Sequence, residues 1–145
     1  MLDHDSARAE KPTKILVALA GAEPALGEAL LAGARAKLDG FGAEVEVIRL
    51  SRVRDVPQAL ALAERMQEFD GYVALGVVTG RSHVERALMG LGMSGGLVGI
   101  GLVAAEGCTA EAATLEGGAA AVSVLELIGL ARAWAGKSKG IGFRA

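Results

Sequence analysis

The chain has 145 residues, of which 52% are hydrophobic and 3% aromatic, and its formal net charge is −2 at pH 7. That length suits one domain able to bury about two-thirds of its unfolded surface, and the apolar content excludes a disordered chain. The slightly acidic balance and the few aromatic residues argue against a nucleic-acid-binding protein. A single cysteine, Cys108, excludes an intrachain disulfide framework, and two histidines leave little for a metal site.

Both ends of the chain are polar. Residues 1–13 lack the apolar segment of a signal peptide or anchor and are expected to form a disordered tail. Residues 14–136 are expected to form one domain, followed by a basic C-terminal tail over residues 137–145. The longest uncharged stretch, residues 87–105, is too rich in glycine for a bilayer span. We therefore expect a cytoplasmic protein that does not contact a membrane.

Four short apolar runs predict β-strands. They are Lys14–Ala20, Glu44–Leu50, residues 72–78 and residues 97–103. The run at Glu44–Leu50 alternates apolar and charged residues, which predicts a half-exposed edge strand, and the others predict buried strands.

A helical pattern follows each of these strands. The helices are predicted at residues 25–38, 55–69, 82–93 and 115–134. Gly40 is expected to end the first, and the second and third begin with the patterns of capping boxes at Asp55 and Ser82. The strict alternation of strand and helix predicts a three-layer αβα sandwich around a four-stranded parallel sheet.

Ligands of such sheets bind at the carboxyl ends of the strands, so four loops are candidates for a site. They are residues 21–23, 51–55, 79–83 and 104–109. The first loop lacks the three-glycine fingerprint of a dinucleotide-binding fold, and the third lacks the Gly-Lys-Ser/Thr ending of a P-loop.

His83 and Arg81 are the candidate functional residues of the third loop. A histidine at a helix start favours the neutral imidazole, which can accept a proton, but His83 can also be simply a solvent-facing residue of the first helical turn. Arg81 can hold a phosphate or carboxylate together with the free N–H groups of that helix, or be an ordinary surface arginine.

The second loop offers further polar candidates. Asp55 can hydrogen-bond a polyol or serve only as a helix cap, and Glu23 in the first loop has the same two interpretations. Arg52 and Arg54 can bind an anion or form a solvated edge. Cys108 is expected to be an inert thiol.

The segment DGYVALGVVTGRSH (residues 70–83) resembles the third strand and active-site loop of lumazine synthases. The resemblance extends to the first strand at residues 15–20, to LLAGA (residues 30–34), to the fourth strand at residues 99–103 and to the alanine-rich residues 117–127. It implies a flavodoxin-like subunit that assembles into a pentamer or a larger shell. The implied activity needs no cofactor or metal. It condenses 5-amino-6-(ribitylamino)uracil with 3,4-dihydroxy-2-butanone 4-phosphate in riboflavin biosynthesis.

The resemblance also implies roles for single residues. His83 matches the family's proton-transferring histidine, and Asp55 falls at the carboxylate that binds the ribityl chain. The residues expected to contact the pyrimidine and sugar-phosphate substrates come from the first three loops, the end of the third strand and the fourth strand: Ala22, Glu23, Val53, Arg54, Asp55, Val78, Thr79, Gly80, Arg81, Ser82 and Ile100.

Three departures from the family pattern leave alternative functions open. Ala22 replaces the aromatic residue that stacks on the pyrimidine, and arginines replace a glycine and a phenylalanine in the second loop. No lysine or arginine lies between Arg86 and Arg132, where the family has its phosphate-binding arginine. The chain is thus predicted to be a lumazine synthase, with a non-catalytic, assembly-forming paralogue and a binder of another anionic ligand as alternatives.

Overall fold

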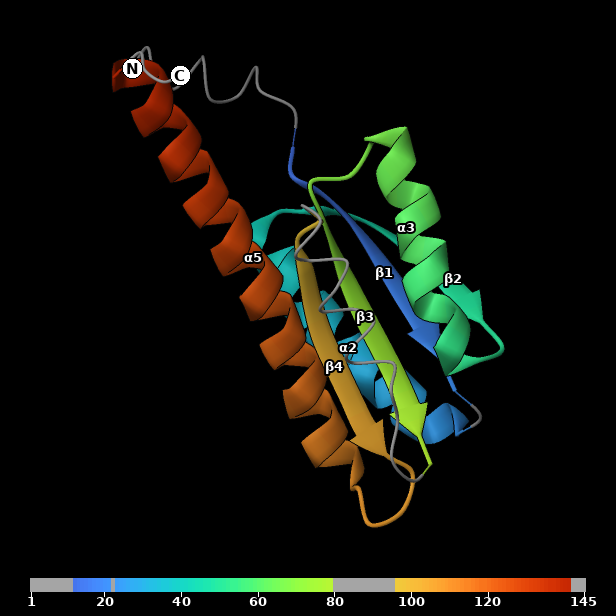
Figure 1. The fold of residues 1–145 in the computed structure, drawn as a ribbon. Coiled ribbons are helices and arrows are strands. Elements are labelled where there is room, and N and C mark those ends of the chain that lie inside the picture. Colours follow the sequence, from blue (N-terminus) through green and yellow to red (C-terminus); the bar gives the residue numbers. More distant parts are fainter. Residues whose placement is uncertain (1–11, 22, 80–95, 142–145) are drawn as a thin grey trace.

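Four parallel strands form the centre of the computed structural model, which describes residues 12–21, 23–79 and 96–141. The strands are β1 (Lys14–Ala20), β2 (Glu44–Leu50), β3 (Gly71–Val78) and β4 (Val98–Ala104). They stand in the order β2-β1-β3-β4 and every neighbouring pair is parallel (Figure 1). The predicted strands agree with these bounds to within one residue, and the parallel sheet is confirmed.

The burial of each strand agrees with its position in the sheet. All residues from Ile15 to Ala20 in β1 and from Gly71 to Val77 in β3 are buried, as central strands covered on both faces must be. The charged residues Glu44, Glu46 and Arg49 of β2 are exposed, which confirms the predicted edge strand. The fourth strand is less buried than predicted. Val98, Ile100 and Leu102 are half-buried and alternate with the buried Gly99 and Gly101.

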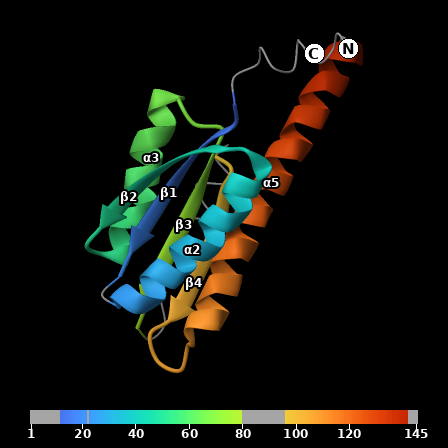
Figure 2. The same cartoon turned by 180° about the vertical axis from the view of Figure 1, so that it is seen from behind.

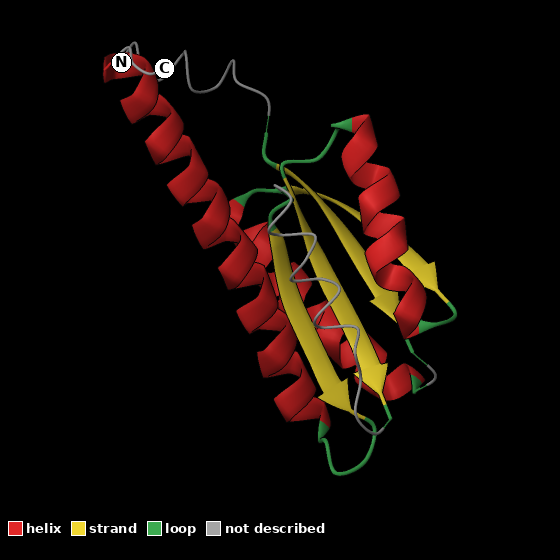
Figure 3. Ribbon diagram, viewed as in Figure 1, coloured by secondary structure: helices red, strands yellow, loops and turns green. Residues whose placement is uncertain are grey.

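Helices cover both faces of the sheet. The helices α2 (Pro24–Phe41) and α5 (Ala110–Ile141) lie side by side on one face, seen from behind in Figure 2. The helix α3 (Val56–Met66) lies on the other face (Figure 3). One apolar cluster joins Val17 and Val73 to the first pair of helices, and a second joins Leu16 and Ala74 to α3. The predicted three-layer sandwich is therefore confirmed, while the helix predicted at residues 82–93 lies outside the described residues.

The ends of α2 and α3 differ from the prediction. Gly40 does not end α2, which continues to Phe41 and is closed by Gly42 in the left-handed region at φ 88°. The predicted capping box at Asp55 is wrong, because Asp55 has helical backbone angles and its side chain caps nothing. A short 3-10 turn, η1 (Val53–Asp55), leads directly into α3 instead. The helix α3 ends at Met66 rather than Phe69, and Gln67 follows it in the left-handed conformation.

Helix α5 is longer than predicted at both ends. Thr109 begins it, because the Thr109 hydroxyl oxygen accepts a hydrogen bond from the amide of Ala112 at 3.0 Å. At the other end the helix runs through Lys137 to Ile141, into the segment that we expected to be a basic tail. By length and mean hydropathy alone, Ala110–Lys137 could cross a membrane, and 39% of its apolar 18-residue window is buried within the domain.

Glycines bring α5 unusually close to its neighbours. A methyl group built at Gly33 of α2 would overlap the carbonyl oxygen of Thr114, and one at Gly117 would overlap that of Leu30. Similarly, a methyl group at Gly99 of β4 would overlap the carbonyl oxygen of Ala120. These three glycines thus serve contacts in which backbone packs directly on backbone.

Candidate active site

The carboxyl ends of all four strands meet at one edge of the sheet, where the arrowheads lie in Figure 1. Ala20, Leu50, Val78 and Ala104 are the last residues of the strands there. Because the strands are parallel, the loops that follow them converge on this edge, which is where α/β sheets bind ligands. Ala22, Gly80, Arg81, Ser82 and the predicted catalytic residue His83 lie outside the described residues.

The loop after β1 packs directly against β3. Gly21 has φ 128°, and a Cβ atom built on it would lie 2.8 Å from the carbonyl oxygen of Val77. Only glycine accommodates both this backbone angle and this close approach. Glu23 follows as the exposed residue before α2, and its side chain makes no capping hydrogen bond.

The loop after β2 is fastened to β3 by Val53. A Cβ atom built on Gly76 would lie 3.2 Å from Val53 Cγ1, so the valine sits over this glycine near the end of β3. Val53 and Ile100 both pack against the apolar cluster beneath α3 and are half-buried. The structure therefore places these two predicted substrate contacts partly in the core, where they can form only the apolar floor of a site.

Polar residues stand exposed around this floor. Arg54 and Asp55 are exposed on η1, and Thr79 is exposed after the half-buried Val78. The loop after β4 begins alongside, because the amide of Ala105 donates a hydrogen bond to the carbonyl oxygen of Val78 at 2.8 Å. The described part of the edge thus combines a carboxylate, a hydroxyl and arginines above an apolar base, a combination suited to a polar, anionic ligand.

Arg49, at the end of β2, is committed to an ion pair. Its guanidinium binds the carboxylate of Glu28 on α2, and both side chains are 57% exposed. The hydrogen bond from Arg49 lowers the pKa of Glu28, and that carboxylate raises the pKa of Arg49 in turn. Among the described residues, no carboxylate forms such a pair with Arg52 or Arg54.

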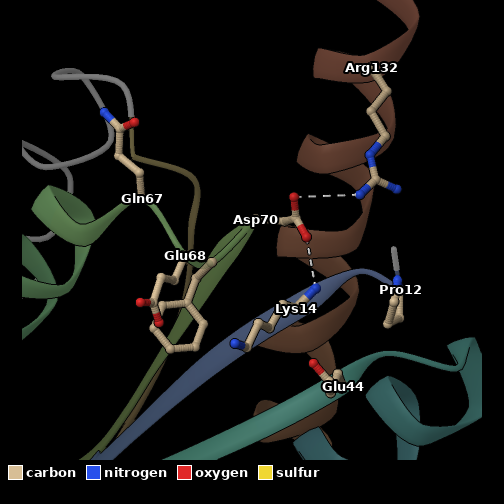
Figure 4. A pocket seen from close by; sticks show the side chains of 8 residues that line it. Pro12, Lys14, Glu44, Gln67, Glu68, Asp70 and Arg132 are labelled. Carbon is tan, nitrogen blue, oxygen red and sulfur yellow. Dashed lines mark hydrogen bonds and ion pairs between the residues drawn. The ribbon is translucent and has the colours of Figure 1, made fainter. Parts of the chain in front are cut away.

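A pocket of about 540 Å³ lies at the opposite edge, beside the amino ends of the strands (Figure 4). Asp70 lies in it and accepts a hydrogen bond from the backbone amide of Lys14 at 2.8 Å. Arg132 of α5 approaches the same carboxylate at 3.7 Å, and the Lys14 ammonium stands 5.4 Å from the centre of the Phe69 ring. These contacts tie α5 to the starts of β1 and β3. This pocket could not be predicted from the sequence, because its residues come from four separate segments.

The contacts that organise the candidate site could not be predicted from the sequence either. Gly21 and Gly76 bring the first two loops onto β3. Their positions in the sequence indicate a close backbone approach, because Gly21 directly follows a predicted strand and Gly76 lies within one. Neither position specifies the partner, because Val77 and Val53 are far away in the sequence.

The chain was compared with models of protein families and with curated proteins. No family model matches the chain. A 6,7-dimethyl-8-ribityllumazine synthase from Jannaschia sp. (strain CCS1) is 33% identical over 150 residues, covering 93% of this chain and 84% of the relative. The protein of the same name from Novosphingobium aromaticivorans is 38% identical over 127 residues, covering 75% and 89%. That from Methylorubrum populi is 33% identical over 157 residues, covering 86% and 92%.

The all-parallel sheet, with helices on both faces and its candidate site at the carboxyl ends of the strands, defines an α/β protein of the flavodoxin-like type. The similarity to two of these relatives covers 93% and 86% of the chain. The chain belongs to the 6,7-dimethyl-8-ribityllumazine synthase family.

Proposed function

We propose that this chain is a lumazine synthase of riboflavin biosynthesis. It would condense 5-amino-6-(ribitylamino)uracil with 3,4-dihydroxy-2-butanone 4-phosphate and release phosphate and water. The observation that carries the proposal is the similarity along 93% of the chain to a relative of that name. The convergence of the loops after β1, β2 and β3 on one edge of the sheet supports it, because a two-substrate reaction needs contacts from several loops.

The reaction requires imine formation, loss of phosphate and ring closure with loss of water, and each step moves protons. His83 is the proposed proton carrier, because a neutral imidazole accepts and returns a proton close to neutral pH. Exposed Asp55 is suited to hydrogen-bond the hydroxyls of the ribityl chain, and Val53 and Ile100 would support the pyrimidine from below. Glu23 and Thr79, with Ala22, Gly80 and Ser82, would complete the surroundings of the substrates.

Lumazine formation from the two substrates tests this proposal directly. The product absorbs at longer wavelength than the pyrimidine, so its appearance is followed continuously and compared with the uncatalysed reaction. We expect clear turnover by the full chain and a loss of about 10²-fold or more in the variant His83→Ala. Product formation no faster than without protein would contradict the proposal.

The second candidate function is that of an assembly-forming paralogue without turnover. Ala22 cannot stack on a pyrimidine ring, and the chain has no lysine or arginine between Arg86 and Arg132 to bind phosphate. Absence of turnover together with a defined assembly would favour this candidate over the enzyme.

Both candidates include assembly of the subunit into a pentamer or a larger shell. Large apolar side chains on α5 support self-association, because Leu115 is 74% exposed and Trp134 is 62% exposed. Light scattering measures the assembled mass, and a monomer at micromolar concentration would contradict this part of the proposal.

A further inference from the structure

We propose that Arg52 and Arg54 form the site that binds the phosphate group of the phosphorylated substrate. This inference rests on the proposed function, and it assigns the phosphate to the loop after β2. The sequence provides no lysine or arginine from residue 87 to residue 131, a range that includes β4, the loop after it and most of α5. The cation for a phosphate must therefore come from another loop.

Different cations lie at the two edges of the sheet. Lys14 and Arg132 lie at the amino ends of the strands, in the pocket around Asp70. Arg65 lies in the last turn of α3, which runs back toward that same edge. At the carboxyl ends, the described cations are Arg49, Arg52 and Arg54, all from β2 and the loop after it.

Two of these three arginines have no carboxylate partner within the described part of the chain. Arg49 is held by the carboxylate of Glu28. Arg52 and Arg54 are exposed, and no ion pair joins either of them to another described residue. An arginine without a carboxylate partner keeps its five N–H donors for an incoming anion, and a guanidinium binds phosphate through two parallel hydrogen bonds.

The backbone that carries this arginine pair is held in place. Val53, between the two arginines, sits over Gly76 of β3. The amide of Asp55 donates a hydrogen bond to the carbonyl oxygen of Arg52 at 3.1 Å, which closes the turn. Val56 then begins α3 and is 1% exposed. The two guanidinium groups thus extend from a turn fixed on both sides, which reduces the entropy lost when they bind an anion.

Steady-state kinetics of the double variant Arg52→Ala/Arg54→Ala tests the assignment. We expect KM for the butanone phosphate to rise roughly 10-fold to 100-fold, because charge-assisted hydrogen bonds are lost. We expect KM for the pyrimidine to change by less than about twofold, because this substrate carries no phosphate. Inorganic phosphate should inhibit the wild-type protein in competition with the butanone phosphate and should inhibit the double variant more weakly by a similar factor.

Three further variants sharpen the result. The double variant Arg52→Lys/Arg54→Lys keeps both positive charges but loses the forked N–H donors of arginine. Its KM for the butanone phosphate should therefore lie between that of the wild type and that of the alanine double variant. Arg65→Ala removes another exposed arginine, at the opposite edge, and should leave KM unchanged. Arg81→Ala tests the other candidate cation. A rise in KM for the butanone phosphate in Arg81→Ala, with none in the Arg52/Arg54 double variant, would overturn the assignment.

A binding measurement separates this inference from the proposed function. If the wild-type protein shows no turnover, its thermal unfolding is measured with and without inorganic phosphate. Stabilisation of the wild type and of Arg65→Ala, but not of the arginine double variant, would support the anion site even though the enzymatic proposal had failed. Equal stabilisation of the wild type and the double variant would overturn it.

Discussion

The hydroxyl of Tyr72 on β3 donates a hydrogen bond to Oε1 of Glu64 on α3 across 2.7 Å. Tyr72 is 1% exposed, so this bond satisfies a phenol that has no access to water. Burial raises the pKa of Tyr72, and the hydrogen bond to Glu64 and the charge of that carboxylate raise the pKa further.

This raised pKa predicts that the protein loses stability at high pH. The unfolded chain releases the phenol proton near pH 10, whereas the folded protein retains it, so the free energy of unfolding falls as pH rises above about 10. We expect this fall to be smaller in Tyr72→Phe, which should also lose about 1 kcal/mol near neutral pH. Urea unfolding of both proteins at several pH values measures these effects. Tyr72 is the chain's single tyrosine, so phenolate absorbance titrates it alone, and ionisation near pH 10 in the folded state would contradict the prediction.

Two glycines of α2 should respond oppositely to replacement by alanine. Gly33→Ala places a methyl group on the carbonyl oxygen of Thr114, so α2 and α5 must separate, at a cost of about 1–3 kcal/mol or more. Gly40→Ala meets nothing within 4 Å and should stabilise the helix by about 0.5–1 kcal/mol. Denaturant midpoints compare the two variants, and a neutral Gly33→Ala would show that the helices can move apart freely.

Gly21 and Gly107 distinguish close packing from backbone strain. Gly107 has φ 79° with nothing within 4 Å of a built Cβ atom, so Gly107→Ala should cost about 1 kcal/mol from strain alone. Gly21→Ala adds overlap with the backbone of Val77 and should cost clearly more. Thermal unfolding of both variants measures the difference, and equal losses would refute the contact between the first loop and β3.

The two contacts of the Asp70 carboxylate should differ in their contribution to stability. Arg132→Ala removes an ion pair whose side chains are 53% and 43% exposed, which should cost less than about 1 kcal/mol and depend on salt. Asp70→Ala also removes the acceptor of the Lys14 amide and should cost about 1 kcal/mol more. Urea unfolding at low and high salt checks both values, and a larger loss in Arg132→Ala than in Asp70→Ala would contradict this account.

Much of the fold could be predicted from local patterns. The strand bounds, the edge position of β2 and the parallel sheet follow from apolar runs and their periodicity, which depend on burial alone. Helix ends were less predictable. Gly42 rather than Gly40 closes α2, and α5 extends to Ile141, because nothing in the sequence forces a helix to stop at a glycine.

The loops that form the candidate site could be predicted from the sequence, but the contacts between them and the sheet could not. The rule for parallel sheets placed Arg54 and Asp55 at the ligand-binding edge. It could not show that Val53 turns inward onto Gly76, because that contact joins residues distant in the sequence. The pairing of Arg49 with Glu28 was equally out of reach, since two exposed side chains meet there only through the packing of α2 beside β2.

The unequal burial of α5 has a consequence for its hydrogen exchange. At 32 residues the helix is about 48 Å long, roughly twice the length of β4. Its buried positions end at Ile128, and every residue from 129 to 137 is exposed. Amide protons near Ala120 and Val124 are therefore expected to exchange only when the whole domain unfolds, whereas those near Lys137 exchange by local fraying. One continuous helix would then report both the global stability of the domain and the intrinsic stability of an unsupported helical end.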